Sequence, residues 1–261
     1  MKNLVITVSP ESSIDLLGGY ADIIILDKDP VPNAMAFYDT LYIRSHFGQP
    51  STLPQVFRSE IEDIVKRAMR ENPNIKFIDG VNSVDKILSI EDKWRQYDTY
   101  SVFMPKTKLL TEDIDVSGFD TPIYKNRLSS NGNGVTWDID KTTGPKEDWL
   151  VQESLKITEE LRVYLIYGEV YPVGALRRSK SSDENTQAVD SRLLAQDEID
   201  FSLRIGEKGP SMDIVGLDIV RTEDGRLYLL EVNRSPGFGK FEKLTGVNLA
   251  GVLYKETSHK G

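Results

Sequence analysis

The feature that most constrains the fold is an Asp-Gly dipeptide at residues 224–225, between two alternating apolar runs at 213–221 and 226–233. Asp-Gly in this setting predicts a β-hairpin with a two-residue type I′ turn, because that turn needs positive φ at both central positions. The register of such a hairpin places Asp218 directly opposite Glu231. Like charges that face each other across two strands destabilise a sheet. A hairpin that keeps this pair therefore needs an interaction that offsets the repulsion.

The same register places Asn233 opposite Gly216, so that Asp218, Glu231 and Asn233 share one face. That predicted face also carries four apolar residues: Ile214, Val220, Leu227 and Leu229. No Lys or Arg lies on it within the hairpin, so two partly buried carboxylates would share a proton or bind a cation. Two carboxylates and one amide oxygen suit Mg²⁺. The alternative is an edge hairpin whose two acids point into solvent.

The composition of the whole chain narrows the class of protein. The chain has 261 residues, no cysteine and a formal net charge of −9 at pH 7. The lack of cysteine excludes disulfides, thiolate metal sites and a cysteine nucleophile, and the negative charge argues against a general nucleic-acid binder. No apolar run is long enough for a transmembrane helix, and the N-terminus shows no signal-peptide pattern. We therefore expect a cytoplasmic protein that does not contact membranes.

The first third of the chain alternates strands with a helix. Residues 55–70 carry apolar side chains at the spacing of an amphipathic helix. The predicted strands around it are 4–8, 21–27, 39–45 and 75–79. This alternation predicts a small α/β domain over residues 1–92, followed by a second helix at 92–100.

The middle of the chain changes to short strands and loops. The predicted elements are strands at 122–126 and 149–155, a long hairpin at 161–178 that turns near Gly168-Glu169, and a polar loop at 179–196.

Lys125 lies near the end of a predicted strand and precedes a loop of small residues at 126–135. Backbone N–H groups of such a loop can wrap phosphates and close over them. Neither a Walker A pattern nor G-x-G-x-x-G is present in the sequence. The loop therefore indicates a phosphate site of another kind, and an ordinary surface turn rich in Asn and Gly is the alternative.

The motifs also follow one another in a recognisable order. They are Lys93, Pro105-Lys106-Thr107, Lys125 with its Gly-rich loop, Gln152-Glu153-Ser154-Leu155, Glu160-Leu161-Arg162, Arg177, Gly216-Leu217-Asp218, and Glu231-Val232-Asn233-Arg234-Ser235-Pro236-Gly237. This order resembles the ATP-grasp superfamily and, within it, the RimK-like carboxylate–amine ligases. The resemblance covers most of the chain. It implies an α+β / α/β ATP-grasp fold with an N-terminal α/β pre-ATP-grasp domain at 1–92, a central subdomain at 93–152 and a C-terminal subdomain at 153–261.

The resemblance also implies a role for individual residues. In the family pattern, the residues that contact ATP are Lys93, Lys125, Ser130, Asn131, Gly132, Gly134, Gln152, Glu153, Ser154, Leu155 and Glu160. Lys125 would contact both the phosphates and the adenine, and Glu160 would contact the ribose. Arg177 and Lys125 would stabilise the transferred phosphoryl group. Asp218, Glu231 and Asn233 would bind Mg²⁺, with Mn²⁺ as a compatible substitute.

The activity implied by the resemblance is ATP-dependent amide bond formation through an acyl phosphate. Its partners would be small-molecule or peptide carboxylates and amines, and a homo-oligomer is compatible with the sequence. A kinase on the same fold and a non-catalytic nucleotide-binding module are the alternatives. Family features that line the substrate side cannot be placed between Arg177 and Gly216, where Arg178, Lys180 and Arg192 are the candidates for that role. A Ser-His-Asp hydrolase is disfavoured, because G-x-S-x-G is absent and only two histidines are present.

Overall fold

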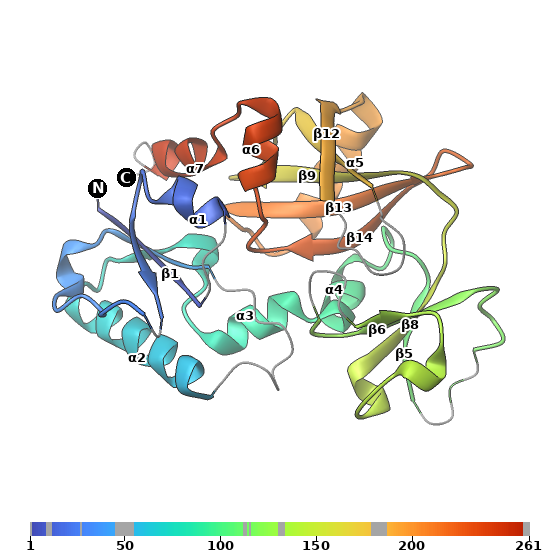
Figure 1. The fold of residues 1–261 in the computed structure, drawn as a ribbon, viewed down its shortest axis with the longest axis horizontal. Helices are drawn as coiled ribbons and strands as arrows, with labels where there is room; N and C mark the ends of the chain where they lie inside the picture. Colours follow the sequence, from blue (N-terminus) through green and yellow to red (C-terminus); the bar gives the residue numbers. More distant parts are fainter. Residues whose placement is uncertain are drawn as a thin grey trace.

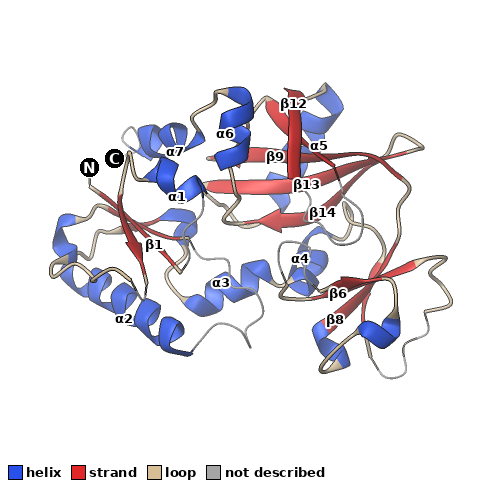
Figure 2. Ribbon diagram, in the orientation of Figure 1, coloured by secondary structure: helices blue, strands red, loops and turns tan. Residues whose placement is uncertain are grey.

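The computed structural model describes residues 2–8, 12–26, 28–44, 55–111, 114, 116–129, 134–178 and 187–257. The helices are α1 (Ser12–Leu17), α2 (Gln55–Glu71), α3 (Val84–Glu91), α4 (Lys93–Tyr100), α5 (Gln196–Lys208), α6 (Gly239–Thr245) and α7 (Leu249–Thr257). The strands are β1 (Asn3–Thr7), β2 (Asp22–Ile25), β3 (Thr40–Ile43), β4 (Lys76–Phe77), β5 (Thr107–Leu109), β6 (Pro122–Asn126), β7 (Val135–Thr136), β8 (Trp149–Glu153), β9 (Ile157–Ile166), β10 (Glu169–Val170), β11 (Val173–Arg178), β12 (Gln187–Leu193), β13 (Ile214–Thr222) and β14 (Leu227–Asn233). Figures 1 and 2 show that they form three sheets with helices around and between them.

The N-terminal sheet is parallel, with the strand order β2-β1-β3-β4. Helix α2 buries Ile61, Val65 and Ala68 in one core with Leu4 of β1 and Leu41 of β3. The helix and the strands predicted in this region are therefore confirmed, although β4 has only two residues.

The opposite face of this sheet is covered by α6 and α7, two helices that were not predicted from the sequence. Val5 and Tyr42 share a second core with Phe241 of α6 and Leu253 of α7. In Figure 1, α1, α6 and α7 lie side by side over β1. The C-terminal helices thus fasten the N-terminal sheet to the rest of the molecule.

The largest sheet has the order β12-β11-β9-β13-β14, and β10 adds to β9. The predicted hairpin at 161–178 is confirmed, but it turns one residue earlier than expected, at Tyr167-Gly168, between the paired residues Ile166 and Glu169. Tyr167 and Gly168 both have positive φ, of 54° and 84°. These are the conformations of a two-residue type I′ turn.

The β13–β14 hairpin differs from the prediction at its loop. The Thr222 N–H donates to the Arg226 carbonyl (3.0 Å), which leaves three loop residues instead of two. Only Gly225 has positive φ (81°), whereas a type I′ turn also needs it at Asp224. The expected type I′ turn is therefore wrong.

The predicted pairing of Asp218 with Glu231 is nevertheless confirmed, because β14 carries a bulge. Asp218 pairs with Glu231, but Ile219 pairs with Leu229, so Leu230 is an extra residue on β14. The bulge offsets the extra loop residue and reverses the face of the strand beyond it. Leu229 consequently lies in the core on the opposite face from Glu231, and placing Leu227 and Leu229 beside the acids was wrong.

The polar stretch at 179–196 is only partly a loop. Residues 179–186 lie outside the described residues, but residues 187–193 form β12 along β11, and α5 begins at Gln196. The loop prediction is therefore wrong for β12. This stretch is mostly polar, so a strand was not predicted from its sequence. The side-chain partners of Arg192 in this strand lie in other elements.

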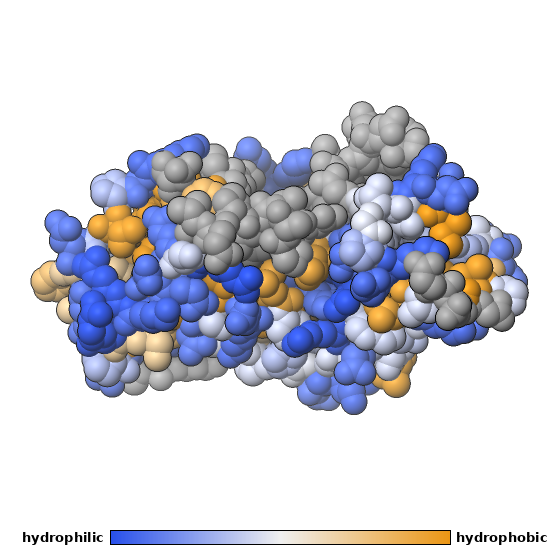
Figure 3. Space-filling model, turned by 90° about the horizontal axis from the view of Figure 1, so that it is seen from below, coloured by the Kyte–Doolittle hydropathy of each residue, from blue (hydrophilic) through white to orange (hydrophobic). Residues whose placement is uncertain are grey.

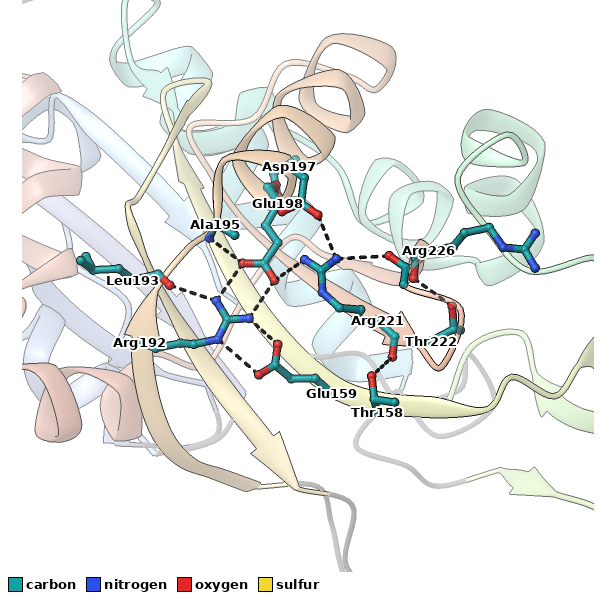
Figure 4. A network of polar contacts seen from close by, with 12 residues as sticks. Thr158, Glu159, Arg192, Leu193, Ala195, Asp197, Glu198, Arg221, Thr222 and Arg226 are labelled. Carbon is teal, nitrogen blue, oxygen red and sulfur yellow. Dashed lines mark hydrogen bonds and ion pairs between the residues drawn. The ribbon is translucent and has the colours of Figure 1, made fainter.

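One of these partners is a buried carboxylate, Glu198 in the first turn of α5 (Figure 4). Arg192 of β12 forms a bidentate pair with it, at 2.7 and 2.8 Å, and Arg192 also bonds Glu159 of β9. Arg221 of β13 donates to Glu198 as well, at 2.9 Å. Glu198 itself is fully buried. Two strands and α5 thus meet at the Glu198 carboxylate, and β9 joins the network through Arg192.

Glu198→Gln is expected to destabilise the protein by about 3 kcal/mol, because it leaves two arginines without their shared charge. Burial alone would raise the pKa of Glu198, but hydrogen bonds from Arg192, Ala195 N–H and Arg221 lower it to about 2. The folded pKa lies below the unfolded value, so this stabilisation is present above about pH 4.5 and is lost as the pH falls toward 2.

Urea unfolding of wild type and variant at neutral and acidic pH measures the effect. The difference in the free energy of unfolding between wild type and Glu198→Gln should decrease at acidic pH. Glu207→Gln is the control, because Glu207 is an exposed residue of the same helix. Equal stability of Glu198→Gln and Glu207→Gln would contradict the prediction.

The central sheet is antiparallel, with the order β5-β8-β6-β7, and it buries Tyr124, Trp149 and Val151. Helix α4 does not join this core. Tyr100 packs instead with Leu229 and Val232 of the large sheet, and Figure 1 shows α4 between β14 and the central sheet. The division of the chain at residues 92 and 152 stays a prediction.

Hydrophilic residues dominate the molecular face drawn in Figure 3, and the hydrophobic ones form separate patches among them. Among the described residues, the three most exposed large apolar side chains are Phe37, Val102 and Leu193, which lie far apart in the sequence. Single exposed apolar residues of this kind are usual on protein surfaces. Among the helices in the described ranges, none has the length and apolar character needed to cross a bilayer.

Candidate nucleotide and metal site

Asp218 lies at the centre of the candidate site, on β13. It is 5% exposed. Arg162 of β9 stands directly opposite it and forms a bidentate pair, with Nε–Oδ1 and Nη2–Oδ2 both at 2.7 Å. The Asn233 side chain donates to Asp218 Oδ2 at 3.2 Å. The structure therefore brings Asp218 and Asn233 together, as predicted from the hairpin register.

Glu231 has its own cation. The Lys93 ammonium, at the start of α4, lies 3.3 Å from Glu231 Oε1. The same ammonium donates to the backbone carbonyl of Ser129, beside the Gly-rich loop. Lys93 therefore joins the hairpin acids to the predicted phosphate loop.

These two pairs disfavour the shared proton, which was one of the two alternatives for the facing acids. The hairpin has no cation on the face of its acids, but β9 and α4 supply Arg162 and Lys93. Each carboxylate is thus paired with a cation. Like-charge repulsion between Asp218 and Glu231 is offset locally.

Lys125 of β6 completes the cluster. Burial, followed by the charge of Lys93, lowers the pKa of Lys125 to about 8. Three carboxylates oppose this shift: Glu231, Glu160 and Asp218. Residues from β9, the β13–β14 hairpin and α4 therefore act on one ammonium.

The Gly-rich loop is described at its two ends. Gly134 has a φ of 68°, and a Cβ there would lie 2.9 Å from Asn126 Cβ. Only glycine fits this turn without strain. The Gly134 carbonyl accepts from Asn126 N–H at 2.8 Å, which closes the base of the loop. Ser130, Asn131 and Gly132 lie outside the described residues.

The predicted purine-binding segment leads from β8 towards β9. Gln152 is buried and donates to Thr107 Oγ1 at 2.8 Å. Glu153 accepts from Lys106 N–H at 2.8 Å, and Ser154 N–H donates to the Thr121 carbonyl at 3.1 Å. Leu155 is partly buried. These bonds hold the segment against the central sheet.

Glu160 and Arg177 are paired residues of β9 and β11. Glu160 lies two residues before Arg162, so both point to the face that carries Asp218. The side chain of Arg177 lies outside the description, and so does that of Arg178. Lys180 is not described. Arg192 bonds Glu159 and Glu198 on the opposite face of the sheet, and its assignment to the substrate side was wrong.

Sequence reasoning missed Arg162 as a site residue. The available signal was its spacing of two from Glu160, which places both side chains on one strand face. Its position opposite Asp218, however, depends on β9 lying next to β13. These strands are separated in sequence by three others.

The residues present fit a magnesium ion. Within the ranges that the structure describes, no group of three or more His, Cys, Asp or Glu is arranged to hold a metal. Asp218 and Glu231 supply two carboxylates, and Asn233 can add an amide oxygen. This incomplete set of hard oxygen ligands suits Mg²⁺, which commonly takes its remaining ligands from water and nucleotide phosphates.

Comparison with known proteins agrees with this arrangement. Residues 105–256, more than half of the chain, match the family described as the RimK-like ATP-grasp domain. A probable alpha-L-glutamate ligase 2 from Hahella chejuensis is 30% identical over 207 residues, which cover 67% of this chain and 66% of the relative. A ribosomal protein bS6–L-glutamate ligase from Escherichia fergusonii is 33% identical over 125 residues, which cover 45% of this chain and 40% of the relative.

The fold is also that of solved ATP-grasp ligases. The structure of the ATP-grasp ligase PsnB complexed with a minimal precursor matches with a TM-score of 0.69, at 15% identity, over 99% of both chains. The match at this identity concerns the fold, and the family match rests on the sequence. This chain belongs to the RimK-like ATP-grasp family.

Proposed function

We propose that this protein is an ATP- and Mg²⁺-dependent ligase that joins a carboxylate to an amine. The observation that carries the proposal is the cluster of Lys93, Lys125 and Arg162 around Asp218 and Glu231. Transfer of a phosphoryl group needs little covalent chemistry from the protein. It needs positioned positive charge where negative charge spreads in the transition state.

Asp218, Glu231 and Asn233 would hold the metal. Bound Mg²⁺ would neutralise charge on the nucleotide phosphates. Arg162 and Lys93 now pair with the two carboxylates, and a bound cation would free both side chains to contact phosphate oxygens. Lys125 would remain protonated near phosphates, because negative charge raises the pKa of an ammonium group.

The remaining assignments follow from the family pattern. Residues Ser130 to Gly134 would close over the phosphates, and Gln152 to Leu155 would hold the adenine. Glu160 would bind the ribose, and Arg177 would stabilise the transferred phosphoryl group together with Lys125. We propose that Mn²⁺ can substitute for Mg²⁺. We also propose that the protein acts in the cytoplasm, which supplies ATP.

The reaction proceeds in two balanced steps. A substrate carboxylate oxygen attacks the γ-phosphorus of ATP, and ADP leaves with the electrons of the broken P–O bond. The amine then attacks the acyl carbon and expels inorganic phosphate, and its extra proton passes to solvent. The relatives include proteins named as L-glutamate ligases, and the PsnB structure holds a precursor. We therefore propose amino acids or peptides as the source of both groups.

Hydroxylamine trapping is expected to give a hydroxamate. Purified protein is given Mg·ATP with amino acids and short peptides, singly and in pairs, and ADP release is measured. With an active carboxylate but no natural amine, hydroxylamine should attack the acyl phosphate and speed ADP release, because it replaces the missing acceptor.

Reactions without the carboxylate are the control for plain ATP hydrolysis. A stable phosphate ester that hydroxylamine ignores would replace the ligase by a kinase. Nucleotide binding without ADP release from any tested substrate would favour a non-catalytic module.

A further inference from the structure

Gln96 is a buried residue of α4, one helical turn after Lys93, and it is 3% exposed. Its side-chain amide makes three hydrogen bonds. Nε2 donates to the Val232 carbonyl at 2.9 Å and to the Ile90 carbonyl at 3.0 Å, while Oε1 accepts from Val232 N–H at 3.0 Å. Both bonds to Val232 use the planar amide in the way that a neighbouring peptide group would.

Val232 is the residue between Glu231 and Asn233. It lies on β14, the edge strand of the large sheet, so its outward N–H and C=O have no strand to pair with there. Gln96 takes the place of that strand at one residue. The backbone between the two proposed metal ligands is thereby fixed to α4.

Lys93 is the first residue of helix α4. Asp92 caps the helix by accepting from Trp94 N–H at 2.8 Å, and a second bond, from Leu229 N–H to the Phe103 carbonyl at 2.8 Å, ties the chain after α4 to the same strand. The helix and the turn after it are therefore joined to β14 at Val232 and at Leu229, on either side of Glu231 along the strand. The contact between Lys93 and Glu231 spans 3.3 Å.

We infer that Gln96 is a positioning residue that sets the location of Lys93 relative to Glu231 and Asn233. The inference rests on the proposed function, since it assumes that Lys93 binds phosphates and that the hairpin binds Mg²⁺. Gln96 touches neither substrate nor metal. It acts by locking the phosphate-binding helix to the metal-binding strand, so that both meet the nucleotide in one fixed geometry.

Glutamine suits this task because one rigid group supplies both a donor and an acceptor. Methionine has a similar length but loses all three bonds and leaves buried backbone groups unsatisfied. A misplacement on the scale of an ångström can cost up to about 100-fold in a positioned site. We expect Gln96→Met to weaken Mg·ADP binding by about tenfold or more.

The test is a double-mutant cycle on the full-length protein, with Mg·ADP affinity measured by calorimetry. If Gln96 acts through Lys93, Gln96→Met should change affinity by less than about twofold when Lys93→Ala is already present. Asn3→Leu is the matched control. Asn3 also uses a buried amide for two bonds, to the Tyr20 carbonyl and from Thr40 Oγ1, but it lies in the N-terminal sheet.

Gln96→Glu serves if Gln96→Met does not fold. Its carboxyl group can donate to the Val232 carbonyl only when protonated, so its affinity relative to wild type should recover as the pH is lowered. Asn3→Leu should lower stability and leave Mg·ADP affinity unchanged.

Three results overturn the inference. Unchanged affinity in Gln96→Met, or a loss that adds fully to that of Lys93→Ala, would make Gln96 a structural residue only. So would a Gln96→Glu protein whose affinity ignores pH. A wild-type protein that fails to bind Mg·ADP would instead refute the proposed function itself, and the inference with it.

Discussion

A Glu231→Gln protein is expected to lose Mg²⁺-dependent ADP formation by more than about 100-fold. Residues that only hydrogen-bond a metal ligand cost up to about 100-fold when they are replaced, and a direct ligand should cost more. Glutamine keeps the size of the side chain but removes the charge that holds a divalent cation. The measurements are ADP release at saturating Mg·ATP and the thermal shift caused by Mg·ADP. Both should fall together.

The fold itself should tolerate this change. Glu231 is paired with Lys93, whose side chain is only 12% exposed, so we expect Glu231→Gln to lower metal-free stability by about 1–3 kcal/mol, the cost of leaving a buried donor without its charged partner. Glu223→Gln, on the exposed loop of the same hairpin, is the control and should keep full activity. Wild-type turnover in Glu231→Gln would refute the metal assignment.

The Arg162→Met protein is expected to lose about 3–5 kcal/mol of metal-free stability, the cost of leaving a buried charge without its partner. Asp218 is 5% exposed and receives two guanidinium bonds at 2.7 Å, so water cannot readily replace them. Urea unfolding in the presence of a chelator measures the loss. Activity should also fall, because Arg162 lies among the charges proposed to stabilise phosphoryl transfer.

Arg226→Met is the matched control. Arg226 pairs with Asp224 at 2.6 Å on the same hairpin, but its side chain is 69% exposed. Exposed pairs contribute about 0–1 kcal/mol. Arg162→Lys should retain the charge without the two-pronged geometry and fall between wild type and Arg162→Met. Similar losses for Arg162→Met and Arg226→Met would show that Asp218 is solvated and not held by Arg162.

The sequence by itself predicted the pair of Asp218 and Glu231 and the face that Asn233 shares with it. This followed from local chemistry, since an Asp-Gly turn and period-two alternation act over a few residues. The amphipathic spacing of α2 and the apolar runs of the N-terminal sheet were read in the same way. Signals carried by neighbouring residues were enough for these elements.

The two-residue turn rule predicted the correct pairing of Asp218 with Glu231, although the loop of the hairpin is longer than the rule assumed. The structure adds one residue to the loop and one at Leu230 of β14, and the two changes cancel at the site. Between loop and bulge they do not cancel, so Leu229 faces the core instead of the acids. The bulge places Leu229 in one core with Tyr100 of α4, a contact between distant residues that no short stretch of sequence encodes.

Only the tertiary structure decided which cations meet the hairpin acids. Arg162 reaches Asp218 because β9 lies beside β13, and Lys93 reaches Glu231 because Gln96 fastens α4 to the edge of β14. The same holds for Arg192 of β12, which bonds Glu159 of β9, 33 residues earlier in the chain. Turn formation and polar–apolar alternation depend on neighbouring residues, so they can be predicted directly from the sequence. Charge pairing and edge protection depend on which distant segments become neighbours, and that is set by the packing of the whole chain.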